Sequence, residues 1–101
     1  MKPILLHPFA YDELYDAAAR YEDRVSGLGV AFLEEATKSL ALVQESPGSW
    51  PAYRNGVRRL RLHRFPYLVV YSELEAEIWV LAVAHGSRRP GYWNNRSIPT
   101  T

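Results

Sequence analysis

The chain has 101 residues and a formal net charge of +1, and a chain of this length fits one domain, residues 1–101, around a single hydrophobic core. It contains no cysteine, which excludes disulfides and thiolate metal ligands. Its longest apolar run spans seven residues, far fewer than the roughly 20 that cross a bilayer, so we expect a soluble cytoplasmic protein with no membrane partner.

Charge is distributed unevenly along the chain. Residues 1–46 carry four Lys/Arg and eight Asp/Glu, a net charge of −4, whereas residues 47–101 carry eight Arg, no Lys and three Glu, a net charge of +5. Arginine presents a fixed fork of donors that matches phosphate and carboxylate groups. The basic half as a whole therefore predicts an anion-recognising surface, although any single arginine is typical of an ordinary solvated surface.

The N-terminal part predicts a short strand followed by two helices. Proline cannot donate to a ladder, so Pro3 and Pro8 limit a strand over residues 4–6. From Pro8 onward two apolar stripes follow the helical period of 3.6. They consist of Ala10, Leu14, Ala17, Ala18, Tyr21 and Val25, and then of Phe32, Ala36, Leu40 and Val43. Breaks at residues 26–29 and 46–48 make the pair a helical hairpin.

The remaining chain predicts a loop and three strands. The segment 47–56 is rich in Pro, Gly, Ser and Asn, and Trp50 and Tyr53 are expected to pin it to the core. Alternation with period 2 predicts a strand over residues 58–63, and β-branched and aromatic residues predict another over 67–71. A polar connection over 72–77 then leads to an apolar strand over 78–84 that is covered on both faces.

These elements predict an α+β fold in the order β-α-α-β-β-β. The N-terminal helical hairpin packs on a mostly antiparallel sheet of about four strands. A short C-terminal helix or tail follows the last strand, and residues 97–101 are expected to form a mobile tail.

The first candidate site is a row of basic residues on the strand over residues 58–63. Alternate strand residues share a face, so Arg59, Arg61 and His63 are expected on one side, with Arg64 beside them. Two guanidinium groups and an imidazole suit a run of phosphates or the carboxylates of a partner. The alternative interpretation is that an exposed sheet face simply carries polar residues.

The second candidate is His85, which leaves the apolar strand in phase with Trp79, Leu81 and Val83. An imidazole ordinarily titrates near neutral pH, so His85 is a candidate proton carrier if a scissile phosphate lies nearby. The alternative is a hydrogen-bonded histidine of the core or its rim, which is the more common case for a lone histidine at a strand exit.

The third candidate is the segment 88–93. Its rings, Tyr92 and Trp93, are suited to stacking on bases, and its arginines to neutralising phosphate. The alternative, which we favour for Trp93, is that these rings close the core. No metal or other cofactor is predicted, because no metal-binding spacing relates the three histidines His7, His63 and His85.

Several segments form one characteristic pattern. They are an early His-Pro, the run Phe65-Pro66-Tyr67 leading into Val69-Val70-Tyr71, a strand ending Ala82-Val83-Ala84-His85, and Arg89-Pro90 followed by Tyr92-Trp93 and Arg96. Together they resemble the RelE/ParE toxin superfamily of type II toxin-antitoxin systems over nearly the whole chain. The resemblance implies a small toxin that a cognate antitoxin neutralises by wrapping around it.

The resemblance implies two possible targets. RelE-like members cut mRNA on the translating ribosome without a metal, and this mechanism would place Arg59 and Arg61 on phosphate and use His85, Arg88 and Tyr92 as catalytic residues. ParE-like members poison DNA gyrase. The Trp-containing ending, together with the lack of Lys in the basic half, favours the ParE-like branch. A third interpretation is an inactive homologue that only binds its antitoxin.

The candidate residues for binding nucleic acid or a protein partner are Arg58, Arg59, Arg61, His63, Arg64, Arg89, Trp93 and Arg96. We expect the guanidinium row of the 58–63 strand and the aromatic C-terminal segment to meet, with His85 and Arg88, on one solvent-facing surface. That expectation depends on which face of the sheet each side chain occupies.

Overall fold

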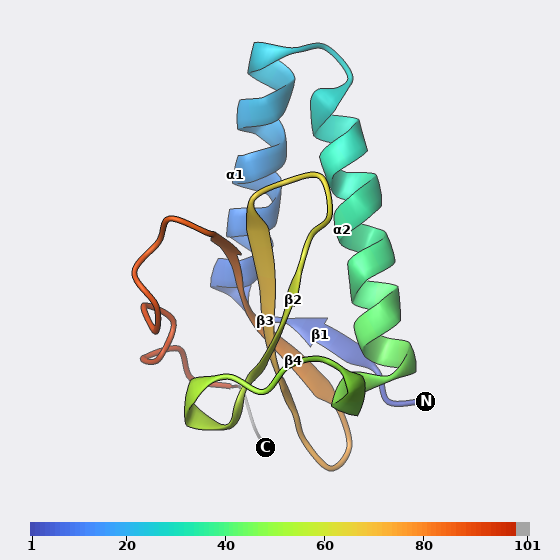
Figure 1. Cartoon of the computed structure of the whole chain (residues 1–101), viewed down its shortest axis with the longest axis vertical. Helices are drawn as coiled ribbons and strands as arrows, with labels where there is room; N and C mark the ends of the chain where they lie inside the picture. The colour runs from blue at the N-terminus through green and yellow to red at the C-terminus, as the bar shows by residue number, and fades with distance from the viewer. Residues whose placement is uncertain (99–101) are drawn as a thin grey trace.

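The computed structural model describes residues 1–98 and confirms the predicted order of elements (Figure 1). Strand β1 (Ile4–Leu6) leads into helices α1 (Pro8–Arg24) and α2 (Leu28–Glu45). Two 3-10 turns, η1 (Pro47–Ser49) and η2 (Arg54–Gly56), precede strands β2 (Arg58–Arg61), β3 (Tyr67–Glu73) and β4 (Ile78–His85). Within residues 1–98, no helix combines the length and apolarity needed to cross a membrane.

Several boundaries differ from the prediction. Strand β3 ends at Glu73 rather than at residue 71, and β4 ends at His85 rather than at residue 84. Strand β2 ends at Arg61 rather than at His63, because the backbone N–H groups of His63 and Arg64 donate to the Glu35 carboxylate of α2 instead of continuing the ladder. After β4 the described chain forms turns and bends over residues 86–95 and no further helix. Of the predicted mobile tail, residues 99–101 lie outside the described residues.

The four strands form one sheet in the order β1-β4-β3-β2, with β1 parallel to β4 and the other pairs antiparallel. The predicted α+β class and the mostly antiparallel sheet are therefore confirmed. Helices α1 and α2 stand side by side against one face of this sheet (Figure 1). Their stripes and the sheet form the helix-side core, which includes Ala10, Leu14, Ala17, Phe32, Ala36, Val43, Leu60, Tyr67, Val69, Tyr71, Val80 and Val83.

Strand β4 contains a β-bulge, and the side chains after it alternate between the sheet faces in the opposite sense. Val70 pairs with Ala82 and the next residue, Tyr71, pairs with Val80, so Leu81 is an extra residue on β4. A bulge of this kind shifts the alternation of side chains by one residue. Leu81 consequently packs on the outer face while Val83 packs under the helices. The predicted common phase of His85 with Trp79 and Leu81 is wrong for this reason, whereas Val83 and His85 do share a face.

A smaller outer core lies on the sheet face opposite the helices. It consists of Val57, Val70, Leu81, Ala82, Ala84 and Trp93. Trp93 is only 3% exposed, which confirms the interpretation that its ring closes the core. The loop residues Trp50 and Tyr53 pack against the helix-side core and the outer core respectively, so both pin the loop as predicted.

The helices approach each other closely at Gly29, and this contact gives a stability prediction. A Cβ atom at Gly29 would lie 2.5 Å from the backbone carbonyl oxygen of Ala18. We expect Gly29→Ala to lower the free energy of unfolding by about 1–3 kcal/mol, since the helices must separate, although Gly→Ala inside a helix ordinarily stabilises by about 0.5–1 kcal/mol.

Urea denaturation of Gly29→Ala measures this effect, and Gly48→Ala is the matched control. A Cβ at Gly48 would meet no atom within 4 Å, so the control should change the free energy of unfolding by less than about 0.5 kcal/mol. A stabilised Gly29→Ala would show that the helices are not in close contact here.

Candidate functional site

The C-terminal segment (residues 86–98) is tied to α1 by the carboxylate of Glu13. Arg96 donates from Nη1 to Glu13 Oε1 at 2.8 Å and from Nη2 to Oε2 at 2.9 Å, and the Tyr92 hydroxyl donates to Oε2 at 2.7 Å. The Arg96 and Glu13 side chains are 12% and 18% exposed. This Glu13 cluster is a bidentate, largely buried ion pair of the kind that fixes geometry strongly.

The Glu13 cluster exists because β1 is short. Strand β1 pairs with β4 only over Ile78 to Val80, so the edge of β4 beyond that point has no strand partner. Along this edge the Val83 N–H donates to Glu13 Oε1 at 3.0 Å, and Arg96 Nη1 donates to the Leu81 carbonyl at 2.8 Å. The ion pair thus satisfies the backbone groups that a longer β1 would pair, as buried polar groups require.

The environment of Tyr92 keeps its phenol protonated. Burial first, and then the hydrogen bond to Glu13 and its negative charge, raise the pKa of Tyr92 above its ordinary value of 10.0. Burial likewise raises the pKa of Tyr71 and of Tyr21. Tyr92 is therefore a poor proton donor or acceptor near neutral pH, and its hydroxyl is already committed to Glu13.

These shifts predict a loss of stability in alkali. A native pKa above the unfolded value means that the native state keeps its proton while the unfolded state loses it, so stability falls as the pH rises above about 10. We expect the free energy of unfolding in urea to decrease between about pH 9 and about pH 11. Tyr92→Phe should flatten this decrease, whereas Tyr15→Phe, at an exposed tyrosine, should not; a pH-independent free energy of unfolding is the opposing result.

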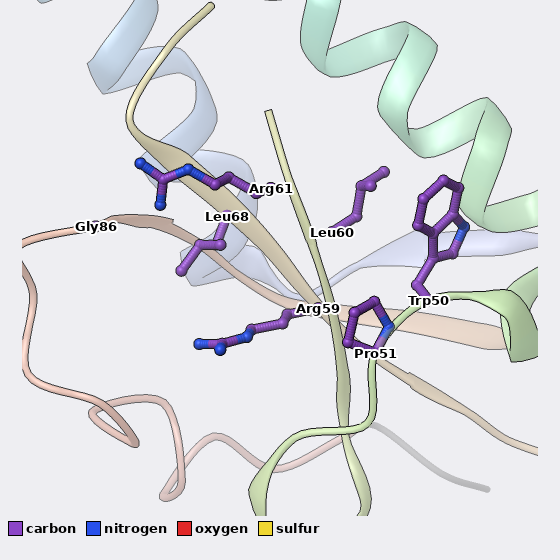
Figure 2. A pocket seen from close by; sticks show the side chains of 7 residues that line it. All are labelled: Trp50, Pro51, Arg59, Leu60, Arg61, Leu68 and Gly86. Carbon is purple, nitrogen blue, oxygen red and sulfur yellow. The ribbon is translucent and has the colours of Figure 1, made fainter. Parts of the chain in front are cut away.

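Arg59 and Arg61 of β2 border a groove of about 530 Å³ that is also lined by Gly86. Figure 2 shows Arg59 and Arg61 extending to the same side of β2 with Leu68 between them, while Trp50 and Leu60 lie across the strand. The Arg59 guanidinium lies 4.1 Å from the centre of the Tyr53 ring, a cation-π arrangement. This groove, the β2 groove, combines two guanidinium groups with an apolar lining of Trp50, Pro51, Leu60 and Leu68.

The other residues predicted beside this row have mixed surroundings. Arg58 is half-buried and donates to the Trp50 carbonyl at 2.8 Å, which fixes the loop after η1 instead of leaving its charge for a ligand. His63 and Arg64 are exposed in the turn that Glu35 caps. The predicted row on one face therefore reduces to Arg59 and Arg61.

His85 and Arg88 lie toward α1 rather than in the β2 groove. His85 packs edge-on against Tyr67 at a centroid distance of 5.1 Å, and it borders two small clefts beside α1. The Arg88 guanidinium sits 3.9 Å from the centre of the Tyr92 ring. Of this region only Gly86 reaches the β2 groove.

The expected single surface is thus divided between the two faces of the sheet. The structure brings Arg59 and Arg61 together in the β2 groove, and it brings His85, Arg88 and Tyr92 together beside α1. Arg89 is exposed. The prediction of convergence on one surface is wrong for His85 and Arg88, since the bulge in β4 places His85 on the helix side and Arg88 lies over Tyr92, which the Glu13 cluster holds beside α1. Trp93 does approach β2, through Tyr53.

Three residues that position the side chains of the candidate site could not be identified from the sequence. Glu13 and Arg20 belong to the polar side of α1, where sequence alone indicates only solvent, and Glu35 belongs to the same class on α2. No local signal identifies them, because their partners lie far along the chain. Among residues 1–98, no group of three or more His, Asp or Glu side chains is placed to hold a metal ion.

The topology and the two basic surfaces define a class of small α+β proteins in which a helical hairpin packs on a four-stranded open sheet. The chain belongs to the ParE toxin family, because the family model described as "ParE toxin of type II toxin-antitoxin system, parDE" matches residues 4–90. The resemblance to the RelE/ParE superfamily is thereby confirmed, in its ParE branch. The protein is a ParE toxin of a type II toxin-antitoxin system, for which a cognate antitoxin is the expected partner.

A solved structure supports the same fold. A chain of the "Chromosomal ParDE TA system from P. aeruginosa" is similar to this chain with a TM-score of 0.71 and 20% sequence identity, over 84% of this chain and 96% of that chain. At this identity the similarity shows the fold alone. A search of curated protein sequences finds no significant match.

Proposed function

We propose that this chain is the growth-inhibiting toxin of a ParDE-type pair, that it acts in the cytoplasm on DNA gyrase, and that an antitoxin neutralises it. Membership in the ParE family supports the toxin role. One observation favours gyrase over mRNA as the target: the Glu13 cluster engages the hydroxyl of Tyr92, a group that RNA cleavage would need free.

The geometry of the other nuclease candidates supports the same choice. Metal-free RNA cleavage needs phosphate-binding cations and an acid or base around one scissile bond. Arg59 and Arg61 border the β2 groove, whereas His85 borders the clefts beside α1. The purified chain is therefore a binding protein in this proposal and performs no covalent step.

Two assays run in parallel test the target. We expect the purified chain to inhibit DNA supercoiling by gyrase and to leave the message uncut in a translating extract. Cleaved message with normal supercoiling would identify a ribosome-dependent nuclease instead. If neither activity appears at saturating protein, the chain is an inactive homologue that only binds its antitoxin.

We assign the β2 groove to the antitoxin. Its apolar floor and its two guanidinium groups complement a segment that combines carboxylates with a large apolar side chain. Charge complementarity of this kind governs the rate and specificity of association. The partner is therefore expected to be acidic where it crosses β2.

Charge reversal in the β2 groove tests this assignment. We expect the double variant Arg59→Glu, Arg61→Glu to weaken binding of the protein encoded beside this chain's gene by at least about a hundredfold. Lys38→Glu, on the exposed surface of α2, is the control and should bind normally. Undiminished binding by a folded double variant would move the antitoxin to another surface.

A further inference from the structure

A small cleft lies between the C-terminal half of α1 and the ends of β3 and β4. It has a volume of about 160 Å³ and is lined by Ala17, Arg20, Tyr21, Arg24, Tyr67 and His85. This α1 cleft is separate from the β2 groove and shares no residue with it. Its polar lining carries guanidinium, phenol and imidazole groups and no carboxylate.

Tyr67 supplies a part-buried hydroxyl with an unused hydrogen. Arg20 Nη2 donates to the Tyr67 hydroxyl oxygen at 3.2 Å, and Tyr67 is only 5% exposed. In the described part of the chain this hydroxyl donates to no acceptor. Because the hydroxyl lines the cleft, its hydrogen is available to an acceptor that binds there.

His85 presents a second donor to the same space. Its Nδ1 accepts from the Ser87 backbone N–H at 3.0 Å, so the ring proton of the neutral imidazole lies on Nε2. Because Nδ1 is occupied, Nε2–H is the group left to meet a ligand. Arg20, Tyr67 and His85 therefore line one cleft from α1, β3 and β4, with the Tyr67 and His85 rings 5.1 Å apart between centroids.

The charges around the cleft also favour an anion. Arg20 and Arg24 carry two positive charges within it, and Tyr21 stays protonated because burial raises its pKa. Two acids, Glu13 and Asp16, line the adjoining cleft, where Glu13 is paired with Arg96 and Asp16 is exposed. On the cleft's own helix, the Glu22 carboxylate is engaged by the Gly27 and Gly29 N–H groups. Arg88 lines that adjoining cleft as well.

We infer that the α1 cleft binds a phosphate group. Guanidinium, phenol and imidazole donors from three elements match the several oxygens of a tetrahedral anion better than the two coplanar oxygens of a carboxylate. The volume is sufficient for a phosphate group, and in a nucleic-acid ligand this group would be a backbone phosphate. The inference does not depend on gyrase being the target, and a failed supercoiling assay leaves it intact.

Titration of the ¹⁵N-labelled chain with inorganic phosphate at constant ionic strength tests the inference. We expect saturable shifts in the amide resonances of α1 from residue 17 to residue 24 and of β4 near His85. Arg20→Gln and Tyr67→Phe should each weaken phosphate binding at least about tenfold, since each removes a hydrogen bond to a charged group. Arg20 is exposed, so its variant is expected to fold normally.

Arg54→Gln is the matched control. Arg54 is an exposed arginine that makes one hydrogen bond, to the Pro90 carbonyl at 3.3 Å, and it lies outside the cleft. Removing its charge should change phosphate affinity by less than about twofold. The comparison separates a localised site from a general attraction of anions to a basic protein.

Further ligands decide between the sources of the phosphate. Displacement of phosphate by a short DNA duplex supports the site with a phosphodiester backbone as its ligand, and no displacement supports it with free phosphate. Three results would overturn the inference: no saturable shift with phosphate, unchanged binding in Arg20→Gln and Tyr67→Phe, or acetate binding as tightly as phosphate.

Discussion

Glu13→Ala is expected to lower the free energy of unfolding by about 3 kcal/mol, a large effect for a residue on the polar side of a helix. The substitution leaves the Arg96 guanidinium, 12% exposed, without its carboxylate. It also removes the acceptors of Tyr92 and of the Val83 N–H. Urea denaturation followed by circular dichroism measures the loss.

The neighbouring residue provides the control for this prediction. Asp12 is exposed on the same turn of α1, and Asp12→Ala should change the free energy of unfolding by less than about 0.5 kcal/mol. In a double-mutant cycle, Arg96→Ala should cost much less in the Glu13→Ala background than alone, because the two residues form one interaction. Additive costs would show that the ion pair contributes nothing.

The order of the elements could be predicted because each one carries its own periodicity. Except for Val25, which lies beyond the end of α1 and is exposed, the stripes of α1 and α2 face the sheet as the 3.6-residue period requires. The alternation of β2 places Leu60 in the helix-side core. The apolar run of β4 is covered on both faces, by the helices and by the outer core. Local pattern and tertiary packing agree in these elements.

The sheet face that each β4 side chain occupies could not be predicted, since nothing in an all-apolar run marks a bulge. The extra residue at Leu81 moves every later side chain to the opposite face. Strict alternation from Trp79 therefore assigns His85 a common face with Leu81, whereas His85 lies against Tyr67 on the helix side. The division of the basic residues into two surfaces follows largely from this single shift.

The contacts of the C-terminal segment could not be predicted from the sequence for a different reason. Glu13 and Arg96 are separated by 83 positions, and each is unremarkable in its own segment. They meet because β1 stops at Leu6 and leaves the edge of β4 unpaired. The position of Arg20 over Tyr67 arises in the same way, from helix docking rather than from any motif.

Trp93 anchors the C-terminal segment to the outer core of the sheet. Its ring packs in the outer core, at 5.7 Å from the Tyr53 ring and 5.4 Å from the Tyr92 ring, measured between centroids. Its indole N–H is buried and has no hydrogen-bond partner among the described residues. The ring therefore contributes through packing, and its polar atom contributes nothing favourable.

Trp93→Ala is expected to lower the free energy of unfolding by about 3–5 kcal/mol, because truncation removes a ring that is 3% exposed and leaves a cavity beside Val70 and Ala84. Trp93→Phe should cost less than about 1.5 kcal/mol, since it keeps most of the packing and removes the unpaired N–H. Urea denaturation measures both losses. A folded, fully stable Trp93→Ala that no longer binds its antitoxin would instead return Trp93 to the partner-binding residues.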